Sequence, residues 1–311
     1  MTFSMSIKIF KNKMQKWDFY LRKSFLTYWT RPKQARDIDI IDEHRNSKRI
    51  AIVVQGKLEE KDDFTLESVR LYRKLYPTVD IIVSTWKGVQ EKQVELLKES
   101  GAVVLLNEIP NPLTGFCNNN LQRISSLNGI LKAKELGAEY VLKCRADQRF
   151  YEGDIFSFMI KLQKQFPLKL KCKAEERVVI CSVGTFNTRL YNWTDMFTFG
   201  TISDVLRYYS CPEDSRDHNA PFVAKDLMDY CMQRPGEIYF ATHYIESLGF
   251  ELKWNYEDSD YYLRELAIVI DNEMIDLFWP KYTKREYIWR RYENIDLKQV
   301  TFKKWLCMQN D

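Results

Sequence analysis

A short apolar segment in the middle of the chain ends in alternating charges. Residues 140–142 (Tyr-Val-Leu) have the pattern of a buried strand, and Lys143, Arg145 and Asp147 follow at every second position. Guanidinium and ammonium groups neutralise phosphate oxygens, and a carboxylate can hold a divalent cation on the same phosphates. The three side chains therefore suit a ligand that carries a diphosphate.

Other polar side chains are expected beside these three. They follow other predicted strands or lie on the first turns of a predicted helix, and they are Gln55 and Gly56, Thr85 and Trp86, and Asn119 and Arg123. Ligands of parallel sheets bind beyond the carboxyl ends of the strands, and a helix N-terminus favours negative charge. We therefore predict that these residues and the charged group line one crevice, with Trp86 stacked on a base.

Each of these residues also has a purely structural interpretation. Asp147 can be a helix cap or a turn residue, and Arg145 can form an ion pair with Asp147 itself. Trp86 can belong to the core, while Asn119 and Arg123 can form an exposed polar helix face. The sequence leaves these alternatives open.

Predicted strands and helices alternate from residue 49 to residue 147. The strands are expected over 49–56, 79–86, 102–108 and 139–147, and the helices over 62–77, 91–100 and 118–137. Short apolar strands that alternate with helices indicate an α/β fold with a mainly parallel sheet covered on both faces. Further along, we expect strands at 177–186 and 265–270, a strand that turns at Gly200 into a helix, and a helix opened by Pro235 and Gly236.

The composition excludes several classes of protein. A net charge of +4 is too small to indicate nucleic acid as a partner. Neither common glycine-rich phosphate loop is present, and no nucleophile-elbow motif occurs. Three histidines without helical pairing and seven scattered cysteines without a Cys-x-x-Cys pair argue against a zinc site. Unpatterned cysteines, and no apolar run of transmembrane length, predict a cytoplasmic protein.

The two ends of the chain are richer in basic and aromatic residues than the middle. We predict a basic amphipathic extension over 1–46, one main domain over 47–275 and a basic aromatic helical tail over 276–311. The extension carries nine Lys or Arg before residue 37 against a single acid, Asp18, with apolar residues at helical spacing. Two interpretations stay open: a helix on the anionic inner face of the cytoplasmic membrane, or a helix packed on its own domain.

The chain resembles the WavE lipopolysaccharide-synthesis family over about residues 50–250. The segments that carry the resemblance, in order, are LYRKLYP…IIVSTW, NNNLQRISSLNG, YVLKCRAD, WTDMFTFG and RPGEIYFATHYI. The resemblance implies a glycosyltransferase with a GT-A-like fold that builds bacterial surface glycans, either lipopolysaccharide or capsule. It also implies a nucleotide-binding half over 47–150, an acceptor half over 151–275, a nucleotide-sugar donor, and a glycan or lipid-linked glycan as acceptor.

The resemblance implies a divalent metal, Mn²⁺ or Mg²⁺, bound by Asp147. GT-A enzymes usually carry Asp-x-Asp at this strand end, where the present chain has Arg145-Ala146-Asp147. One expected carboxylate is therefore a cation. Metal dependence is in question for this reason, because Arg145 can supply the positive charge that a metal otherwise provides.

Two acids are candidates for the base that deprotonates an acceptor hydroxyl. Glu237 opens the helix after Pro235 and Gly236, much as the acidic side chain that serves as the base opens a helix in many inverting GT-A enzymes. Asp195 begins the acceptor half. A helix N-terminus lowers a carboxylate pKa, so a base that works near neutrality needs desolvation or a neighbouring acid. Simple helix capping by Glu237 and a turn role for Asp195 are the structural alternatives.

Two other functions fit the same residues. The protein can be a transferase of a different nucleotide-activated group, such as a polyol phosphate. It can also be a catalytically inactive family member that binds glycan or serves as a scaffold. Release of nucleotide from a donor separates the enzymes from the scaffold.

Overall fold

The computed structural model describes residues 30–39, 48–111, 113–219, 221, 223–280 and 299–310. The chain divides into two compact units, residues 1–33 and residues 34–311. The basic helix predicted in the N-terminal extension and most of the predicted C-terminal tail lie outside the described residues. The following account concerns the second unit.

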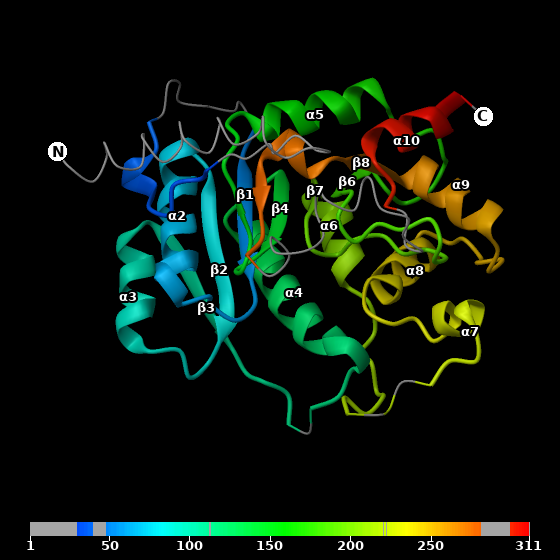
Figure 1. Cartoon of the computed structure of the whole chain (residues 1–311), viewed down its shortest axis with the longest axis horizontal. Helices are drawn as coiled ribbons and strands as arrows, with labels where there is room; N and C mark the ends of the chain where they lie inside the picture. Colours follow the sequence, from blue (N-terminus) through cyan, green and yellow to red (C-terminus); the bar gives the residue numbers. More distant parts are fainter. Residues whose placement is uncertain are drawn as a thin grey trace, which may run out of the picture. The chain divides into compact units, whose positions relative to one another are not determined.

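A seven-stranded sheet forms the centre of the described part of this unit (Figure 1). In spatial order its strands are β3 (Ala102–Asn107), β2 (Asp80–Trp86), β1 (Ile50–Gln55), β4 (Tyr140–Arg145), β7 (Thr198–Thr201), β6 (Val178–Cys181) and β8 (Ala267–Ile270). Within this sheet only β7 runs antiparallel to its neighbours. The predicted fold class, a mainly parallel α/β sheet of GT-A-like type, is confirmed.

Helices cover both faces of the sheet. Their bounds are α2 (Phe64–Leu75), α3 (Glu91–Glu99), α4 (Asn119–Glu135), α5 (Ile155–Gln165), α6 (Ile202–Tyr209), α7 (Leu227–Met232), α8 (Glu237–Ser247), α9 (Tyr256–Leu266) and α10 (Phe302–Cys307). On one face α4 packs across β1 and β2, and α6 packs on β7 with α8 against it (Figure 1). On the other face the ring of Tyr76, which directly follows α2, lies 4.8 Å from the ring of Phe156 in α5.

Close approach of α4 to the sheet depends on a glycine. A Cβ atom added at Gly129 would lie 2.3 Å from Val53 Cγ1 and 3.2 Å from Ser84 Cβ. No real Cβ atom tolerates the first distance, so any larger residue would push the helix away from β1. The same helix ends just before Gly137, whose φ of +83° suits the turn into β4.

Shorter elements complete the unit. A two-stranded antiparallel sheet pairs β5 (Arg149–Phe150) with β9 (Leu277–Phe278). The 3₁₀ helices are η1 (Ala35–Asp37), η2 (Lys61–Asp63), η3 (Phe116–Asn118), η4 (Asn272–Ile275) and η6 (Met308–Asn310). Residues of both predicted terminal segments, 1–46 and 276–311, belong to the packed unit, because η1 contacts α2 and α10 packs on β8. The boundaries at 46/47, 150/151 and 275/276 stay predictions.

Each strand and helix predicted between residues 49 and 147 is present, with shorter ends. One local prediction after that point is wrong. Gly200 does not form a turn, because it lies inside β7 and pairs with Val141 of β4. The chain leaves the sheet at Thr201, whose side chain caps α6 by accepting a hydrogen bond from the Asp204 amide. None of the helices in the described ranges is long and apolar enough to cross a membrane.

Candidate functional site

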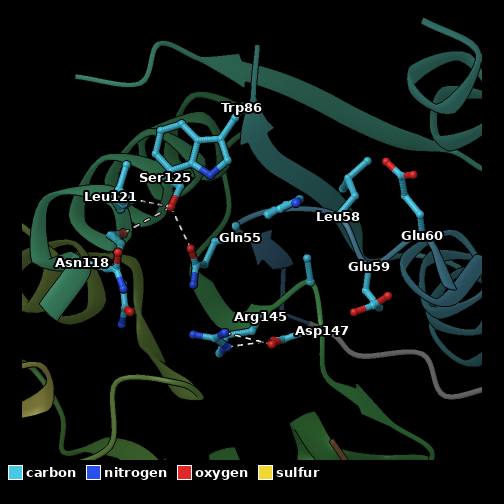
Figure 2. A pocket seen from close by; sticks show the side chains of 14 residues that line it. Gln55, Leu58, Glu59, Glu60, Trp86, Asn118, Leu121, Ser125, Arg145 and Asp147 are labelled. Carbon is cyan, nitrogen blue, oxygen red and sulfur yellow. Dashed lines mark hydrogen bonds and ion pairs between the residues drawn. The ribbon is translucent and has the colours of Figure 1, made fainter. Parts of the chain in front are cut away.

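The carboxyl ends of three neighbouring strands open into a cleft of about 510 Å³, hereafter the strand-end cleft (Figure 2). Its lining includes five residues predicted from the sequence, namely Gln55, Gly56, Trp86, Arg145 and Asp147. The other lining residues are Lys57, Leu58, Glu59, Glu60, Asn118, Leu121, Gln122, Ser125 and Ala146. The β1–β4 register, in which Gln55 pairs with Arg145, brings these strand ends level.

A second pocket of about 380 Å³ adjoins the cleft. We call it the carboxylate pocket, because Asp195 and Glu237 line it together with Arg145, Arg189 and Tyr230. Its remaining lining residues are Cys117, Asn118, Gln122, Val183, Gly184, Phe186, Met196, Pro235, Gly236, Trp279 and Gln299. Three residues, Asn118, Gln122 and Arg145, line both cavities, so the two are continuous at Arg145.

Arg145 and Asp147 form a two-pronged ion pair at the end of β4. Arg145 Nε lies 2.8 Å from Asp147 Oδ1 and Nη2 lies 2.9 Å from Oδ2 (Figure 2). The guanidinium also sits 5.2 Å from the centre of the Trp279 ring. Burial raises the pKa of Asp147, but the hydrogen bonds and charge of Arg145 outweigh it and hold the pKa below its ordinary value. Asp147 is therefore ionised at neutral pH and fixes the direction of Arg145.

The same ion pair bears on the predicted metal. Both carboxylate oxygens of Asp147 already accept hydrogen bonds from Arg145. Mg²⁺ and Mn²⁺ prefer anionic oxygens that are free to coordinate, and a neutralised carboxylate is a poor ligand for them. The described residues also contain no group of three or more His, Cys, Asp or Glu side chains that could hold a metal ion. As arranged, the donor set does not fit a divalent metal.

A serine on the face of α4 that borders the cleft fixes the orientation of the Gln55 side chain. Ser125 Oγ lies 2.7 Å from Gln55 Oε1 and 2.8 Å from the carbonyl oxygen of Leu121. Figure 2 shows the Gln55 amide oxygen turned to Ser125 and its amide nitrogen directed toward Arg145. Gln55 thus presents N–H donors to the cleft beside the guanidinium.

The chain enters α4 through a strained turn. Cys117 and Asn118 both have positive φ, of 53° and 64°, immediately before the helix begins at Asn119. Such conformations are costly for residues other than glycine and occur mainly where function requires them. Here the turn aims the N-terminus of α4, which Asn118 precedes, at the junction of the two cavities. The partial positive charge of a helix N-terminus favours anionic ligands there.

Four predicted ligand residues line neither cavity. Lys143 is fully buried, where its ammonium donates to the carbonyl oxygen of Asp195 and lies 5.0 Å from the Tyr209 ring centre. Burial lowers the pKa of Lys143 to about 8. The Arg123 guanidinium donates to the Cys211 carbonyl at 2.6 Å, the Asn119 amide donates to Asp214 at 2.9 Å, and Thr85 is buried. The structure therefore does not bring Lys143, Thr85, Asn119 or Arg123 to the ligand crevice.

The physical reason differs between strand and helix residues. Strand side chains alternate between the two faces of the sheet, so residues inside a strand end up beneath a helix, whereas residues at its end or past it face the crevice. Lys143 lies inside β4 and is covered by α6, and Thr85 lies inside β2. Asn119 and Arg123 point from α4 toward the loop that contains Cys211 and Asp214.

The two candidate bases lie together in the carboxylate pocket. Asp195 is buried, and its carboxylate accepts a hydrogen bond from the Gln122 amide. Its backbone carbonyl is held by Lys143 and by the Tyr209 hydroxyl, the latter at 2.7 Å. Glu237 is the first residue of α8 and is partly exposed to the pocket. Burial first, and the charge of Asp195 second, raise the pKa of Glu237 to about 7. Either condition raises a carboxylate pKa toward neutrality, where a general base works best, and both are met.

Several lining residues were missed by the sequence analysis. Gln122 and Ser125 are three residues apart within α4, so they share one helix face, and that spacing was a usable signal, whereas Asn118 precedes the helix with a positive φ. Arg189 and Tyr230 had no such signal, because each lies outside any predicted element. Glu59 and Glu60 follow β1 in a loop whose direction the sequence does not specify.

Comparison with known protein families agrees with this architecture. Residues 50–235 match the family described as WavE lipopolysaccharide synthesis. No curated protein matches the chain. The family match covers more than half of the chain and spans β1 through α7, including the Arg145–Asp147 pair and Asp195, and it stops just before Glu237. The chain belongs to the WavE lipopolysaccharide synthesis family.

Proposed function

We propose that the protein is a glycosyltransferase that moves a sugar from a nucleotide-sugar donor to a growing lipopolysaccharide or capsular glycan. Membership of the family implies a role in lipopolysaccharide synthesis. The observation that carries the proposal is the continuity of two unlike cavities at Arg145. One cavity has the cation and helix N-terminus that suit a diphosphate, and the other has the carboxyl that suits an acceptor hydroxyl.

The donor occupies the strand-end cleft in this proposal. Its base lies near Trp86, and its diphosphate lies between Arg145, Gln55 and the N-terminus of α4. As the bond between the sugar and the diphosphate breaks, negative charge grows on the leaving phosphate oxygen. Arg145 is already oriented by Asp147 to meet that charge, so little reorganisation is needed during the reaction.

The acceptor hydroxyl enters from the carboxylate pocket. Glu237 removes its proton as the oxygen forms a bond to the sugar carbon that the diphosphate leaves. Asp195 is the weaker candidate for the base, because its carboxylate is buried and accepts a hydrogen bond from Gln122. The charge of Asp195 keeps the pKa of Glu237 high. Glu237 is therefore the better candidate for the base. Asp195 is thus a positioning and tuning residue.

A guanidinium in place of a metal is the second part of the proposal. Because Arg145 neutralises Asp147 and faces the diphosphate position, we expect transfer to proceed without Mn²⁺ or Mg²⁺. Activity that persists in excess chelator supports this part. Loss of activity in chelator, with recovery on addition of Mn²⁺, shows instead that Asp147 exchanges its arginine for a metal.

The proposed location is the cytoplasmic side of the membrane on which surface glycans grow. Association of the protein with an anionic membrane surface is part of this proposal, and it depends on the N-terminal extension, which lies outside the described residues. Nucleotide-sugar donors are made in the cytoplasm, so an enzyme that uses them works there.

The decisive experiment screens nucleotide sugars and nucleoside diphosphates for thermal stabilisation of the full chain, then measures release of nucleotide from each donor that binds. We expect one nucleotide to raise the melting temperature by binding only the folded state. In Glu237→Gln with acceptor present, release of the nucleoside diphosphate should be lost, while binding of the donor is kept. A wild-type protein that neither binds nor cleaves any nucleotide sugar rejects the proposal in favour of a scaffold.

A further inference from the structure

The carboxylate pocket contains an arginine to which the proposed reaction assigns no role. Arg189 lies in a loop closed by an antiparallel bridge between Phe186 and Asn192. Tyr191 anchors this loop, since it is fully buried and its hydroxyl donates to Asp258 at 2.7 Å. A side chain on such a loop is presented to the pocket from a rigid support.

Arg189 makes no ion pair with any residue that the structure describes. Its Nη1 donates to the Tyr230 hydroxyl at 3.2 Å, and its Nε is buried without an acceptor among the described residues. The guanidinium lies 4.8 Å from the ring centre of Tyr230 and 5.7 Å from that of Phe186. Aromatic faces stabilise the cation but accept none of its hydrogen bonds along the usual lone-pair directions. The group therefore keeps hydrogen-bonding capacity for a ligand.

The charges around the pocket make this capacity unusual. The charged residues that line the pocket are Arg145, Arg189, Asp195 and Glu237. Arg145 is neutralised by Asp147, and Asp195 is buried and hydrogen-bonded to Gln122. The pKa of Glu237, raised to about 7, means that Glu237 carries a proton for part of the time at neutral pH. The charge of Arg189 acts on Glu237 across the pocket and lowers that pKa slightly, but none of the described carboxylates forms an ion pair with Arg189.

Neutral sugars do not need such a cation. Hydroxyl groups are recognised by amides, carboxylates and aromatic faces, and all three are present in the pocket as Gln122, the two acids, Phe186 and Trp279. A buried or half-buried guanidinium is costly to desolvate unless an anion meets it, and its planar fork matches carboxylate and phosphate oxygens.

We propose that the carboxylate pocket selects acceptor sugars that bear an oxyanion, a phosphate or a carboxylate, and that Arg189 binds that oxyanion. This inference rests on the proposed function, because it takes the carboxylate pocket to be the acceptor site. It adds the chemical class of the acceptor, which the family does not specify. Phe186 and Tyr230 flank the oxyanion and offer apolar faces to the sugar ring.

The test compares three sugars of similar size on the full-length protein at constant ionic strength. Glucose 6-phosphate, glucuronate and glucose are titrated while ligand-observed NMR reports their binding, and a nucleoside diphosphate is titrated separately. We expect at least one anionic sugar to bind about 10-fold or more tightly than glucose, since one hydrogen-bonded charge contact is worth about that factor. The phosphate and carboxylate arms show which oxyanion is preferred. Added salt should reduce the preference.

Variants assign the preference to Arg189. Arg189→Gln should abolish the preference and leave nucleoside diphosphate binding unchanged, and Arg189→Lys should retain part of it. Arg70→Gln is the matched control, because it removes the same charge from α2 at a position that lines neither cavity, where Arg70 pairs with Glu67. If wild-type protein binds the anionic and neutral sugars equally tightly, or binds none of them, the inference is overturned.

A different result separates this inference from the proposed function. If Arg189→Gln weakens the nucleoside diphosphate and leaves the sugars unaffected, Arg189 belongs to the donor site and the inference fails while the transferase proposal stands. If wild-type protein binds anionic sugars through Arg189 but no nucleotide, the oxyanion site stands and the proposed donor cleft fails.

Discussion

At the scale of single residues, Arg145 connects the two cavities. It lines both of them, and its partner is Asp147, the residue that the resemblance to GT-A enzymes makes the expected metal ligand. The ion pair is partly exposed, so its contribution to stability is small, about 1 kcal/mol or less. Its value lies in orientation, because a guanidinium held by both prongs is kept pointing at the position proposed for the diphosphate.

Replacing Arg145 tests this role. Arg145→Gln should lower kcat by about 100-fold or more, the usual effect of losing one preorganised donor to a developing oxyanion. Arg145→Lys should recover part of the rate, because it keeps the charge without the fork. Steady-state kinetics with saturating acceptor measure both. A melting temperature close to wild type in each variant shows that the loss is catalytic. Unchanged kcat in Arg145→Gln contradicts the assignment.

The pKa of Glu237 predicts a pH profile. A base works in its deprotonated form, so kcat/KM should rise with pH and level off above a pKa of about 7. In Glu237→Gln the activity should fall by about 100-fold or more and this ascending limb should vanish. Glu246→Gln, on the same helix but paired with Arg234, is the control and should keep the wild-type profile. An ascending limb that survives in Glu237→Gln assigns the base elsewhere.

The same shift predicts an effect on stability. The pKa of Glu237 is higher in the folded protein than its ordinary value of 4.5, so the folded state binds more protons between these values. The free energy of unfolding therefore loses a contribution as pH rises from about 4.5 to about 7. Glu237→Gln removes this loss, so the variant should gain stability relative to wild type at pH 8 compared with pH 5. Denaturant titrations at the two pH values measure the difference.

At the scale of elements, the contact of α4 with the sheet sets the geometry of the cleft. This helix supplies Gln122 and Ser125 to the site, Asn118 immediately precedes it, and Gly129 lets it lie directly against Val53 of β1. Displacing α4 would move the cleft residues of the helix away from Gln55 and Arg145. Packing in the core is thereby coupled to the width of the cleft.

Gly129→Ala tests the coupling. The added methyl should overpack the interface and destabilise the protein by about 1–3 kcal/mol, even though alanine is the better helix former. Val53→Ala creates a cavity and should also destabilise, but the double variant should lose less than the sum of the two, because each change relieves the other. Denaturant titrations of the four proteins give the coupling free energy. Additive losses mean that α4 shifts without contacting Val53.

At the scale of the whole molecule, the described unit begins close to residue 34. The amide of Ala35 donates to Glu67 of α2 at 2.7 Å, and Ala35 itself is buried. A truncation meant to probe the basic extension must therefore stop before this residue. Removing residues 1–29 leaves the contact with α2 intact and takes away most of the predicted amphipathic segment.

This truncation tests the predicted membrane association. If the extension lies on anionic membranes, deletion of residues 1–29 should reduce sedimentation with anionic vesicles and leave donor cleavage unchanged. The wild-type interaction should weaken as salt shortens the electrostatic screening length, with a salt-insensitive remainder from apolar residues. Neutral vesicles serve as the control. Loss of donor cleavage in the truncated protein means that the extension is part of the catalytic unit.

Local patterns in the sequence determined the order of strands and helices and the edge at which the ligand site lies. Strand length, apolar continuity and helix-ending residues are properties of neighbouring residues, and parallel strands place their carboxyl ends together. Gln55, Gly56, Trp86, Arg145 and Asp147 were identified for this reason. Among the residues predicted in this way, those that line the cleft follow a strand or end it.

Tertiary packing decided the rest, because it brings together residues that are distant in the chain. The proximity of Asp195 to Glu237, which raises the pKa of Glu237, comes from the packing of a loop beside the start of α8. The burial of Lys143 follows from the position of α6 over β4. Arg189 reaches the pocket on a loop anchored by Tyr191 and Asp258. A side chain's solvation and partners are set by these distant contacts, so one-dimensional spacing does not specify them.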